Sequence, residues 1–195
     1  NNIPSDLKPT WSKLRSNTKR ISVFCYPGAP LRKWLENLAS LNENVDVLLT
    51  HGHAELLNLY GEQPFHLPNH VQVLSLPFVS QDDYDWLLTQ CDFNIVRGED
   101  SFVRAQLAGK PFLWHIYPQE DRAHEVKLAA FLDLYLENTS QNLRMATIAA
   151  MTWAMPSEWF NSLEEWSKHA ELWRSQLLEN QRDGGLAARL LRFVT

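Results

Sequence analysis

The chain has 195 residues, of which 45% are hydrophobic and 21% charged, with a formal net charge of −5 at pH 7. This length and composition are typical of a globular domain with a substantial core. The acidic balance argues against nucleic acid or an anionic membrane as partner, and no signal peptide, membrane-spanning run or lipidation motif is visible.

The opening residues 1–19 show no pattern of a folded element. They begin with NNIPSDLK and no Met. We expect a linker or lead-in segment here, and a chain that is a piece of a longer protein.

Five apolar runs predict β-strands, with helical patterns between them. The runs are rich in β-branched and aromatic residues, and most are apolar on both faces, as in a parallel sheet covered on both sides. The predicted strands are residues 21–26, 45–50, 71–76, 92–96 and 111–117, and the predicted helices between them are residues 31–41, 80–91 and 101–109. This alternation predicts an α/β fold with a Rossmann-like, doubly wound parallel sheet, which we bound at residues 20–157.

Helix signals support these assignments. Ser80 is a good N-cap, followed by two acidic residues in the first turn. Gly109 is placed to end the helix of residues 101–109, just before Pro111.

After residue 118 the pattern becomes helical. Residues 120–180 read as consecutive helices, and a stripe of apolar residues at heptad spacing runs along one of them. The stripe consists of Trp159, Leu163, Trp166, Ala170, Trp173 and Leu177. It packs on its own sheet or faces a domain outside this chain. We therefore treat residues 158–195 as a helical C-terminal tail, in which DGG at 183–185 precedes a short terminal helix.

Several common catalytic and metal signatures are missing from the sequence. His51 and His53, with Glu55 nearby, lack a third metal ligand at a recognisable spacing, so we expect no metal. No Gly-rich dinucleotide or P-loop motif and no nucleophile elbow is present. Cys25 and Cys91 form no disulfide or CxxC pattern and have no base beside them, which favours a reducing compartment.

The turn RGEDS, residues 97–101, has the composition of an anion site. Gly98 allows a tight turn and close backbone approach. Asp100 or Ser101 is placed to cap the next helix, whose remaining N–H groups and dipole suit a diphosphate, and Arg97 adds a cation. Glu99 does not favour phosphate but can accept hydrogen bonds from sugar hydroxyls. A capped turn with a surface ion pair is the alternative interpretation.

Aromatic and amide side chains follow the third predicted strand. Phe78 and Tyr84 can stack on a flat ring, and Gln81 offers an amide for a base edge. A pyrimidine pocket beside RGEDS is therefore a hypothesis, and for each aromatic taken singly core packing is the favoured interpretation.

The stretch CDFNIVRGEDSFVRAQLAGKPFLWHIYPQEDRAHEVKLAAF, residues 91–131, resembles the donor-binding half of GT-B glycosyltransferases. In these enzymes a strand leads to a Gly-containing turn and a helix, then AGKP, another strand and a Pro. With VFCYPGAPL and LPFVSQDDYDWLL, the chain more specifically resembles the protein-arginine rhamnosyltransferases that modify bacterial elongation factor P, over nearly all of its length from about residue 20.

This resemblance implies an inverting, metal-independent and cofactor-free transfer of rhamnose from dTDP-β-L-rhamnose to an arginine of elongation factor P in the bacterial cytoplasm. It places the donor's sugar and diphosphate at one set of residues and its base and ribose at another. The first set is Tyr26, Arg97, Gly98, Glu99, Asp100 and Ser101, and the second is Phe24, Phe78, Gln81 and Tyr84.

The family's enzymes are about twice this length, and their N-terminal domain carries the aspartates thought to activate the acceptor. Nothing in this sequence matches that domain, so we assign no catalytic base here and expect the chain to be inactive alone. Two alternatives remain: a GT-B domain for another donor, such as a UDP-hexosamine, and a non-catalytic interaction domain.

Overall fold

Five strands in the described part of the chain form one parallel sheet. The computed structural model describes residues 2–50 and 67–182. The strands are β1 (Lys19–Val23), β2 (Val45–Leu49), β3 (Val71–Ser75), β4 (Phe93–Arg97) and β5 (Phe112–His115), and their order is β3-β2-β1-β4-β5. The chain therefore reverses its winding direction between β1 and β4, which is where doubly wound sheets bind ligands. The predicted Rossmann-like α/β class is confirmed.

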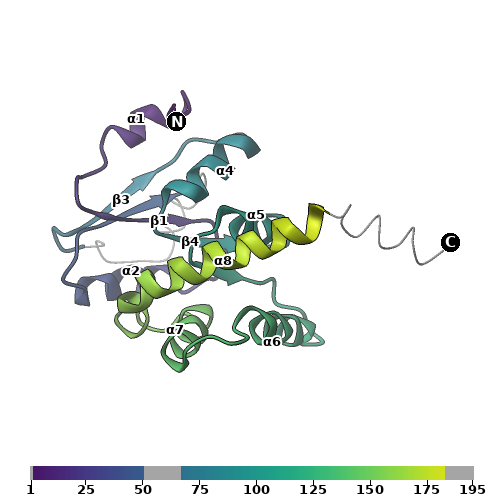
Figure 1. Ribbon diagram of the computed structural model, residues 1–195. Helices are drawn as coiled ribbons and strands as arrows, with labels where there is room; N and C mark the ends of the chain where they lie inside the picture. Colours follow the sequence, from purple (N-terminus) through teal and green to yellow (C-terminus); the bar gives the residue numbers. More distant parts are fainter. Residues whose placement is uncertain (1, 51–66, 183–195) are drawn as a thin grey trace.

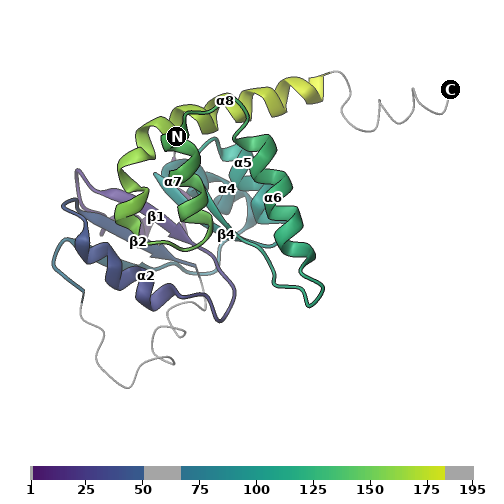
Figure 2. The same ribbon diagram turned by 90° about the horizontal axis from the view of Figure 1, so that it is seen from below.

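Helices cover both faces of the sheet (Figures 1 and 2). The α-helices are α1 (Lys8–Trp11), α2 (Leu31–Asn37), α4 (Gln81–Gln90), α5 (Asp100–Ala108), α6 (Ala123–Tyr135), α7 (Gln141–Met151) and α8 (Leu163–Arg182), and the 3-10 turns are η1 (Leu38–Ser40), η2 (Pro156–Glu158) and η3 (Phe160–Ser162). Figure 1 shows α1 and α4 above the strands, with α2, α6 and α7 below them.

Two hydrophobic clusters fix this layering. The larger joins the sheet to α2, α7 and α8 and includes the fully buried rings of Trp34, Trp159 and Trp166. The smaller lies on the face covered by α1 and α4, around Leu7 and Leu87. Because both faces are covered, strands that are apolar on both sides expose few apolar side chains to water.

The lead-in segment, in which the sequence shows no pattern of a folded element, forms the short helix α1 and packs on the sheet. Leu7 is fully buried. Arg15 donates from its backbone N–H and from Nε to the carboxylate of Asp46, at 2.9 and 2.7 Å, and Asp46 is fully buried in β2. The Arg15 guanidinium also donates to the carbonyl oxygens of Val45 and His70, at 2.8 and 3.0 Å. This network ties the segment to the start of β2 and β3.

Two strands near the site end earlier than predicted. β1 ends at Val23 instead of residue 26, and β5 ends at His115 instead of residue 117. Beyond β1 the backbone N–H of Tyr26 donates to the Nδ1 atom of His115 at 3.1 Å instead of to a neighbouring strand. The apolar pattern continues past the point where the ladder stops, so it overestimates the strand.

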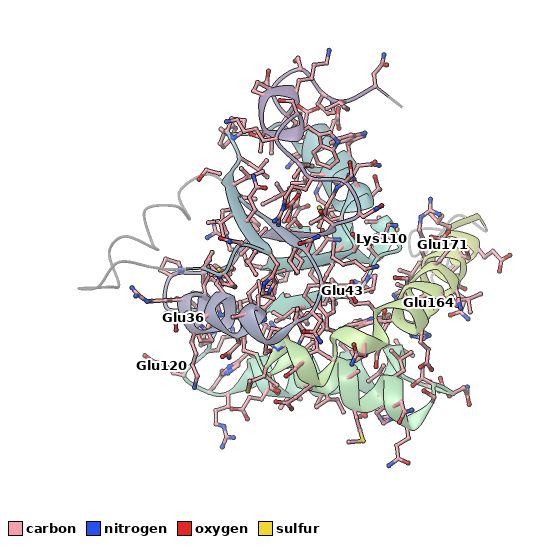
Figure 3. The ribbon with its side chains drawn as sticks, turned by 90° about the vertical axis from the view of Figure 1, so that its left-hand side faces the viewer. Glu36, Glu43, Lys110, Glu120, Glu164 and Glu171 are labelled. Carbon is pink, nitrogen blue, oxygen red and sulfur yellow. The ribbon has the colours of Figure 1, made fainter. Side chains whose placement is uncertain are left out.

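The tryptophan stripe divides between two elements. Trp159 lies between η2 and η3 and not on α8, because the chain turns twice as 3-10 helix before α8 begins. Trp159 and Trp166 are fully buried in the chain's own core, and Trp166 Nε1 donates to the hydroxyl of Tyr135 at 3.0 Å. The interpretation that this part of the stripe faces another domain is therefore wrong. Figure 3 labels Glu164 and Glu171 on α8, and both side chains are exposed.

Some sequence interpretations lie outside the described residues. These are His51, His53 and Glu55, and the terminal helix after residue 185. Within residues 2–50 and 67–182, no helix is long and apolar enough to cross a membrane, and no group of three or more His, Cys, Asp or Glu is placed to hold a metal ion.

Candidate functional site

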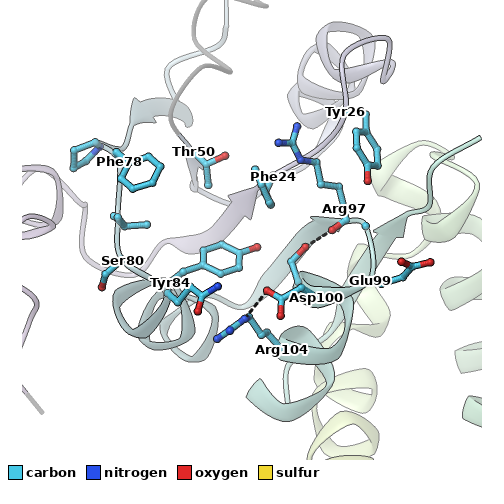
Figure 4. A pocket seen from close by; sticks show the side chains of 15 residues that line it. Phe24, Tyr26, Thr50, Phe78, Ser80, Tyr84, Arg97, Glu99, Asp100 and Arg104 are labelled. Carbon is cyan, nitrogen blue, oxygen red and sulfur yellow. Dashed lines mark hydrogen bonds and ion pairs between the residues drawn. The ribbon is translucent and has the colours of Figure 1, made fainter.

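A cavity of about 490 Å³ opens at the carboxyl ends of β1, β2 and β4, at the switch point of the sheet (Figure 4). It brings together every residue that the sequence put forward for the two ends of the donor. Its lining is Phe24, Tyr26, Thr50, Pro77, Phe78, Val79, Ser80, Gln81, Tyr84, Arg97, Gly98, Glu99, Asp100, Ser101 and Arg104. What these residues bind stays a prediction.

The turn between β4 and α5 depends on Gly98. Its φ is +65°, in the left-handed region, and a Cβ there would lie 3.0 Å from the hydroxyl of Tyr26. The Gly98 carbonyl accepts a hydrogen bond from Trp114 Nε1 at 2.8 Å, which anchors the turn to β5. Glycine is needed both for this conformation and for the close approach of Tyr26.

The first turn of α5 has no side-chain cap, contrary to the prediction that Asp100 or Ser101 supplies one. The N-cap position is Glu99, in helical conformation and without a capping bond. The Ser101 hydroxyl donates back to the carbonyl oxygen of Arg97. The N–H groups at the start of α5 are therefore left to water or a ligand, and together with the helix dipole they attract an anion.

Arg97 lies at the centre of the cavity. Its guanidinium donates to the carbonyl oxygen of Cys25 at 3.1 Å. It also lies over the rings of Phe24 and Tyr26, 4.1 and 5.1 Å from their centroids. Two aromatic faces and one carbonyl hold the planar cation in place while leaving its other N–H groups for a ligand.

Asp100 does not point into the helix start but forms an ion pair one turn along α5. Its carboxylate accepts from Arg104 Nε at 2.8 Å, and Arg104 also donates to Asp85 of α4 at 2.7 Å. The hydrogen bonds from Arg104 to Asp100 and then Asp85 hold the pKa of Arg104 above its usual range. This network joins α4 to α5 beside the cavity, and Figure 4 shows its Asp100–Arg104 pair.

Aromatic side chains form the end of the cavity away from Glu99. Phe78 is 81% exposed, which is unusual because phenylalanine side chains are mostly buried. Tyr84 is half-buried, and its ring meets Phe24 edge-on at 5.8 Å. Gln81 lies in the first turn of α4, where the Ser80 hydroxyl accepts from the Asp83 N–H at 3.1 Å as predicted.

Glu99 stands at the border of a second cavity of about 300 Å³. The two cavities share Tyr26, Gly98 and Glu99. The Glu99 side chain is 83% exposed, and its nearest cation is Lys127 of α6, with Nζ 3.6 Å from Oε1. In Figure 4 Glu99 lies on the far side of the α5 start from Phe78.

Sequence reasoning missed several residues of this site. Thr50, Arg104 and Lys127 line the two cavities, and His115 contacts Tyr26. Thr50 and His115 sit at the carboxyl ends of strands, so their position alone was an available signal. Arg104 and Lys127 lie inside helices, and no sequence pattern distinguishes them from ordinary surface cations.

The site thus presents three kinds of chemistry in a row. One end is aromatic, the middle holds a fixed cation and uncapped helix N–H groups, and the other end carries an exposed carboxylate. A ligand with a flat ring, a charged anionic centre and hydroxyl groups complements this order.

Residues 7–195 match the family model described as Elongation-Factor P (EF-P) rhamnosyltransferase EarP. The chain is 42% identical over 168 residues to a protein-arginine rhamnosyltransferase of Pseudomonas putida, covering 78% of this chain and 45% of that protein. It is 39% identical over 191 residues to that of Pseudomonas aeruginosa, covering 89% and 49%.

A solved structure also matches, with a TM-score of 0.76 and 35% identity, over 97% of this chain and 64% of that one. It is described as the structural basis for EarP-mediated arginine glycosylation of translation elongation factor EF-P. This chain spans about half the length of the curated relatives that it matches.

Proposed function

Because the chain belongs to the EarP family of elongation factor P rhamnosyltransferases, we propose that it is the donor-binding half of a bacterial, cytoplasmic protein-arginine rhamnosyltransferase. Its donor is dTDP-β-L-rhamnose, and the acceptor of the whole enzyme is an arginine of elongation factor P. In this proposal the chain forms one half of a GT-B fold, and an N-terminal domain completes it.

The cavity at the switch point is the observation that carries this proposal. The thymine ring lies at the aromatic end, between Phe78 and Tyr84, with Gln81 at the base edge. The diphosphate lies at the uncapped start of α5 beside Arg97. The rhamnose lies towards Glu99, whose exposed carboxylate accepts hydrogen bonds from sugar hydroxyls.

These residues also have a role in the chemistry. When the bond between sugar and diphosphate breaks, negative charge grows on the departing dTDP. Arg97 and the N–H groups of α5 stabilise that charge, and because they are already in place they need little reorganisation. The site thus helps the leaving group depart without a metal ion in the proposed mechanism.

The acceptor side of the reaction requires a catalytic base, and we assign none in this chain. A protonated guanidinium is a poor nucleophile, and the pKa of arginine is above about 12. A carboxylate must orient or deprotonate it. We place that base in the missing N-terminal half, so the present chain binds the donor without transferring the sugar.

Calorimetry with the isolated chain tests the donor assignment. We expect dTDP and dTDP-rhamnose to bind, and UDP and a UDP-hexosamine to bind at least tenfold more weakly. Tighter binding of the uridine nucleotides would support the alternative GT-B donor. Binding of none of the four would leave the non-catalytic interaction domain as the better description.

A further inference from the structure

β1 and β4 separate at the switch point, and side chains replace their backbone pairing there. The Phe24 N–H donates to the carbonyl oxygen of Ile95 in β4 at 2.8 Å, as in the sheet ladder. Two residues further on, the Tyr26 N–H donates instead to Nδ1 of His115, at 3.1 Å. The carbonyl of the residue between them, Cys25, accepts from Arg97.

His115 reaches this position from the end of β5. Its Cα is in register with that of Arg97. Its half-buried ring packs edge-on against Tyr26 and Trp153, with centroid distances of 5.5 and 5.4 Å. Since Nδ1 accepts a hydrogen bond, the ring is neutral and carries its proton on Nε2. Burial, and then the nearby Arg97, lower the pKa of His115, which favours this neutral form.

We infer that His115 is a positioning residue for the donor site. By accepting the Tyr26 N–H, its Nδ1 keeps the end of β1 apart from β4 and fixes the Tyr26 ring. Tyr26 in turn packs with the Arg97 guanidinium, at 5.1 Å, and its hydroxyl lies against Gly98. This inference rests on the proposed function, because it assigns His115 a role in binding dTDP-rhamnose.

Packing alone does not explain a histidine at this position. A phenylalanine would preserve the edge-on ring contacts with Tyr26 and Trp153. It would leave the partly buried Tyr26 N–H without its acceptor, and we expect the cost of this unsatisfied N–H to make the turn move. Two substitutions therefore separate the two roles. One keeps the ring and removes the acceptor, and the other keeps an acceptor atom and removes the ring.

Calorimetry with dTDP-rhamnose on three forms of the chain makes this test. His115→Asn keeps an acceptor oxygen near the place of Nδ1, and we expect its affinity to stay within about threefold of the wild type. His115→Phe keeps the ring but not the acceptor, and we expect at least a tenfold loss. Equal affinities of wild type and His115→Phe would overturn the inference while leaving the proposed function intact.

His169 provides a matched control, because it does not line either cavity of the donor site. It is also half-buried, and its Nε2 bonds to the carbonyl oxygen of Tyr135 at 2.7 Å. His169→Phe should lower the melting temperature without changing the affinity for dTDP-rhamnose. An affinity loss in both phenylalanine variants would show that the effect is general destabilisation, which overturns the positioning role.

The tautomer of His115 can be measured without any variant, so the inference stays testable if His115→Phe does not fold. Long-range ¹H–¹⁵N spectra of the wild-type imidazole should show Nδ1 without a proton and Nε2 with one. A proton on Nδ1 would overturn the inference. A wild-type chain that binds no donor at all would instead overturn the proposed function, and the inference with it.

Discussion

Arg97 combines structural contacts with its proposed role in binding the diphosphate. It donates to the Cys25 carbonyl and lies over two aromatic rings, so its position is fixed before any ligand arrives. Lysine carries the same charge but cannot form the planar, multi-donor contact. We expect Arg97→Lys to weaken dTDP binding roughly 10- to 100-fold, the equivalent of about 1.5–3 kcal/mol for hydrogen bonds to a charged group.

Arg174→Lys is the control for this substitution. Arg174 also donates to a backbone carbonyl, that of Leu107 at 2.8 Å, but at the other end of α5. Calorimetry should show unchanged dTDP affinity for the control. Arg97→Lys binding as tightly as the wild type would remove Arg97 from the proposed diphosphate site.

Alanine substitutions at Gly98 and Gly28 distinguish the effect of backbone strain from that of steric contact. Both have positive φ, +65° and +89°, so alanine at either position should cost about 1 kcal/mol of unfolding free energy. Only at Gly98 would the new Cβ meet another group, the Tyr26 hydroxyl at 3.0 Å; at Gly28 nothing lies within 4 Å. We therefore expect only Gly98→Ala to weaken dTDP binding as well, by about tenfold, and urea unfolding with calorimetry measures both effects.

Two half-buried histidines predict how stability responds to acid. His115 has its pKa lowered by burial and then by Arg97; the pKa of His169 is lowered by burial against the raising effects of the Tyr135 carbonyl and Glu165. Because the folded pKa lies below the unfolded value near 6.5, the unfolded chain binds more protons in this range. The contribution of these two histidines to the free energy of unfolding is therefore fully present above about pH 6.5. It declines as the pH falls towards their pKa values in the folded chain.

A double variant tests this pH dependence. His115→Asn keeps an acceptor and His169→Gln keeps a donor, while neither residue titrates. The free energy of unfolding of the wild type, measured with urea, should fall between pH 7.5 and 5.5. That of the double variant should fall less over the same range. Identical pH profiles would show that neither histidine controls acid stability.

At the scale of elements, the sequence predicts the strands and helices better than their ends. The apolar runs locate all five strands because both faces of the sheet are covered, so burial marks each strand directly. The ends of β1 and β5 were placed too far along, since the chain leaves the ladder for contacts with His115 that depend on the assembled sheet. Local signals cannot report a partner 89 residues away.

The α5 start shows a second limit of local signals. Asp100 and Ser101 are good capping residues, yet neither caps the helix. Asp100 pairs with Arg104, and the Ser101 hydroxyl bonds to the Arg97 carbonyl. The uncapped first turn, which is the feature best suited to an anion, was therefore not evident from residue types.

Helix α8 provides a prediction about which of its positions belong to the core. Trp166 is fully buried, whereas Leu172, less than two turns later, is 65% exposed. A glutamate in place of Trp166 loses the ring's packing, worth about 3–5 kcal/mol, and buries a charge as well. We expect Trp166→Glu to yield unfolded or aggregated protein and Leu172→Glu to leave the melting temperature within a few degrees, as measured by circular dichroism. A stable, monomeric Trp166→Glu chain would contradict the packing of α8.

At the scale of the molecule, the sequence identified most of the cavity because its residues follow strands. The carboxyl ends of β1, β3 and β4 are distant in the chain, but a parallel sheet brings them to one edge, which gathers Tyr26, Phe78 and Arg97. Of the residues that it missed, Thr50 and His115 also lie at strand ends, whereas Arg104 and Lys127 come from helices packed beside that edge. Arg104 and Lys127 reach the site through tertiary packing, which periodicity does not encode.

The division of the proposed enzyme into halves gives the last prediction. All donor contacts that we propose lie within this chain, whereas we place the base that activates the acceptor arginine outside it. The isolated chain should therefore bind dTDP-rhamnose but transfer no rhamnose to elongation factor P, as followed by mass spectrometry of the acceptor.

Adding the N-terminal half of a relative, such as the Pseudomonas putida enzyme, as a separate polypeptide should restore measurable transfer if the halves assemble. An Arg97→Lys chain in the same mixture should restore at least tenfold less at subsaturating donor, because the donor would then be held less tightly. Transfer by the isolated chain would show instead that a base lies within these 195 residues.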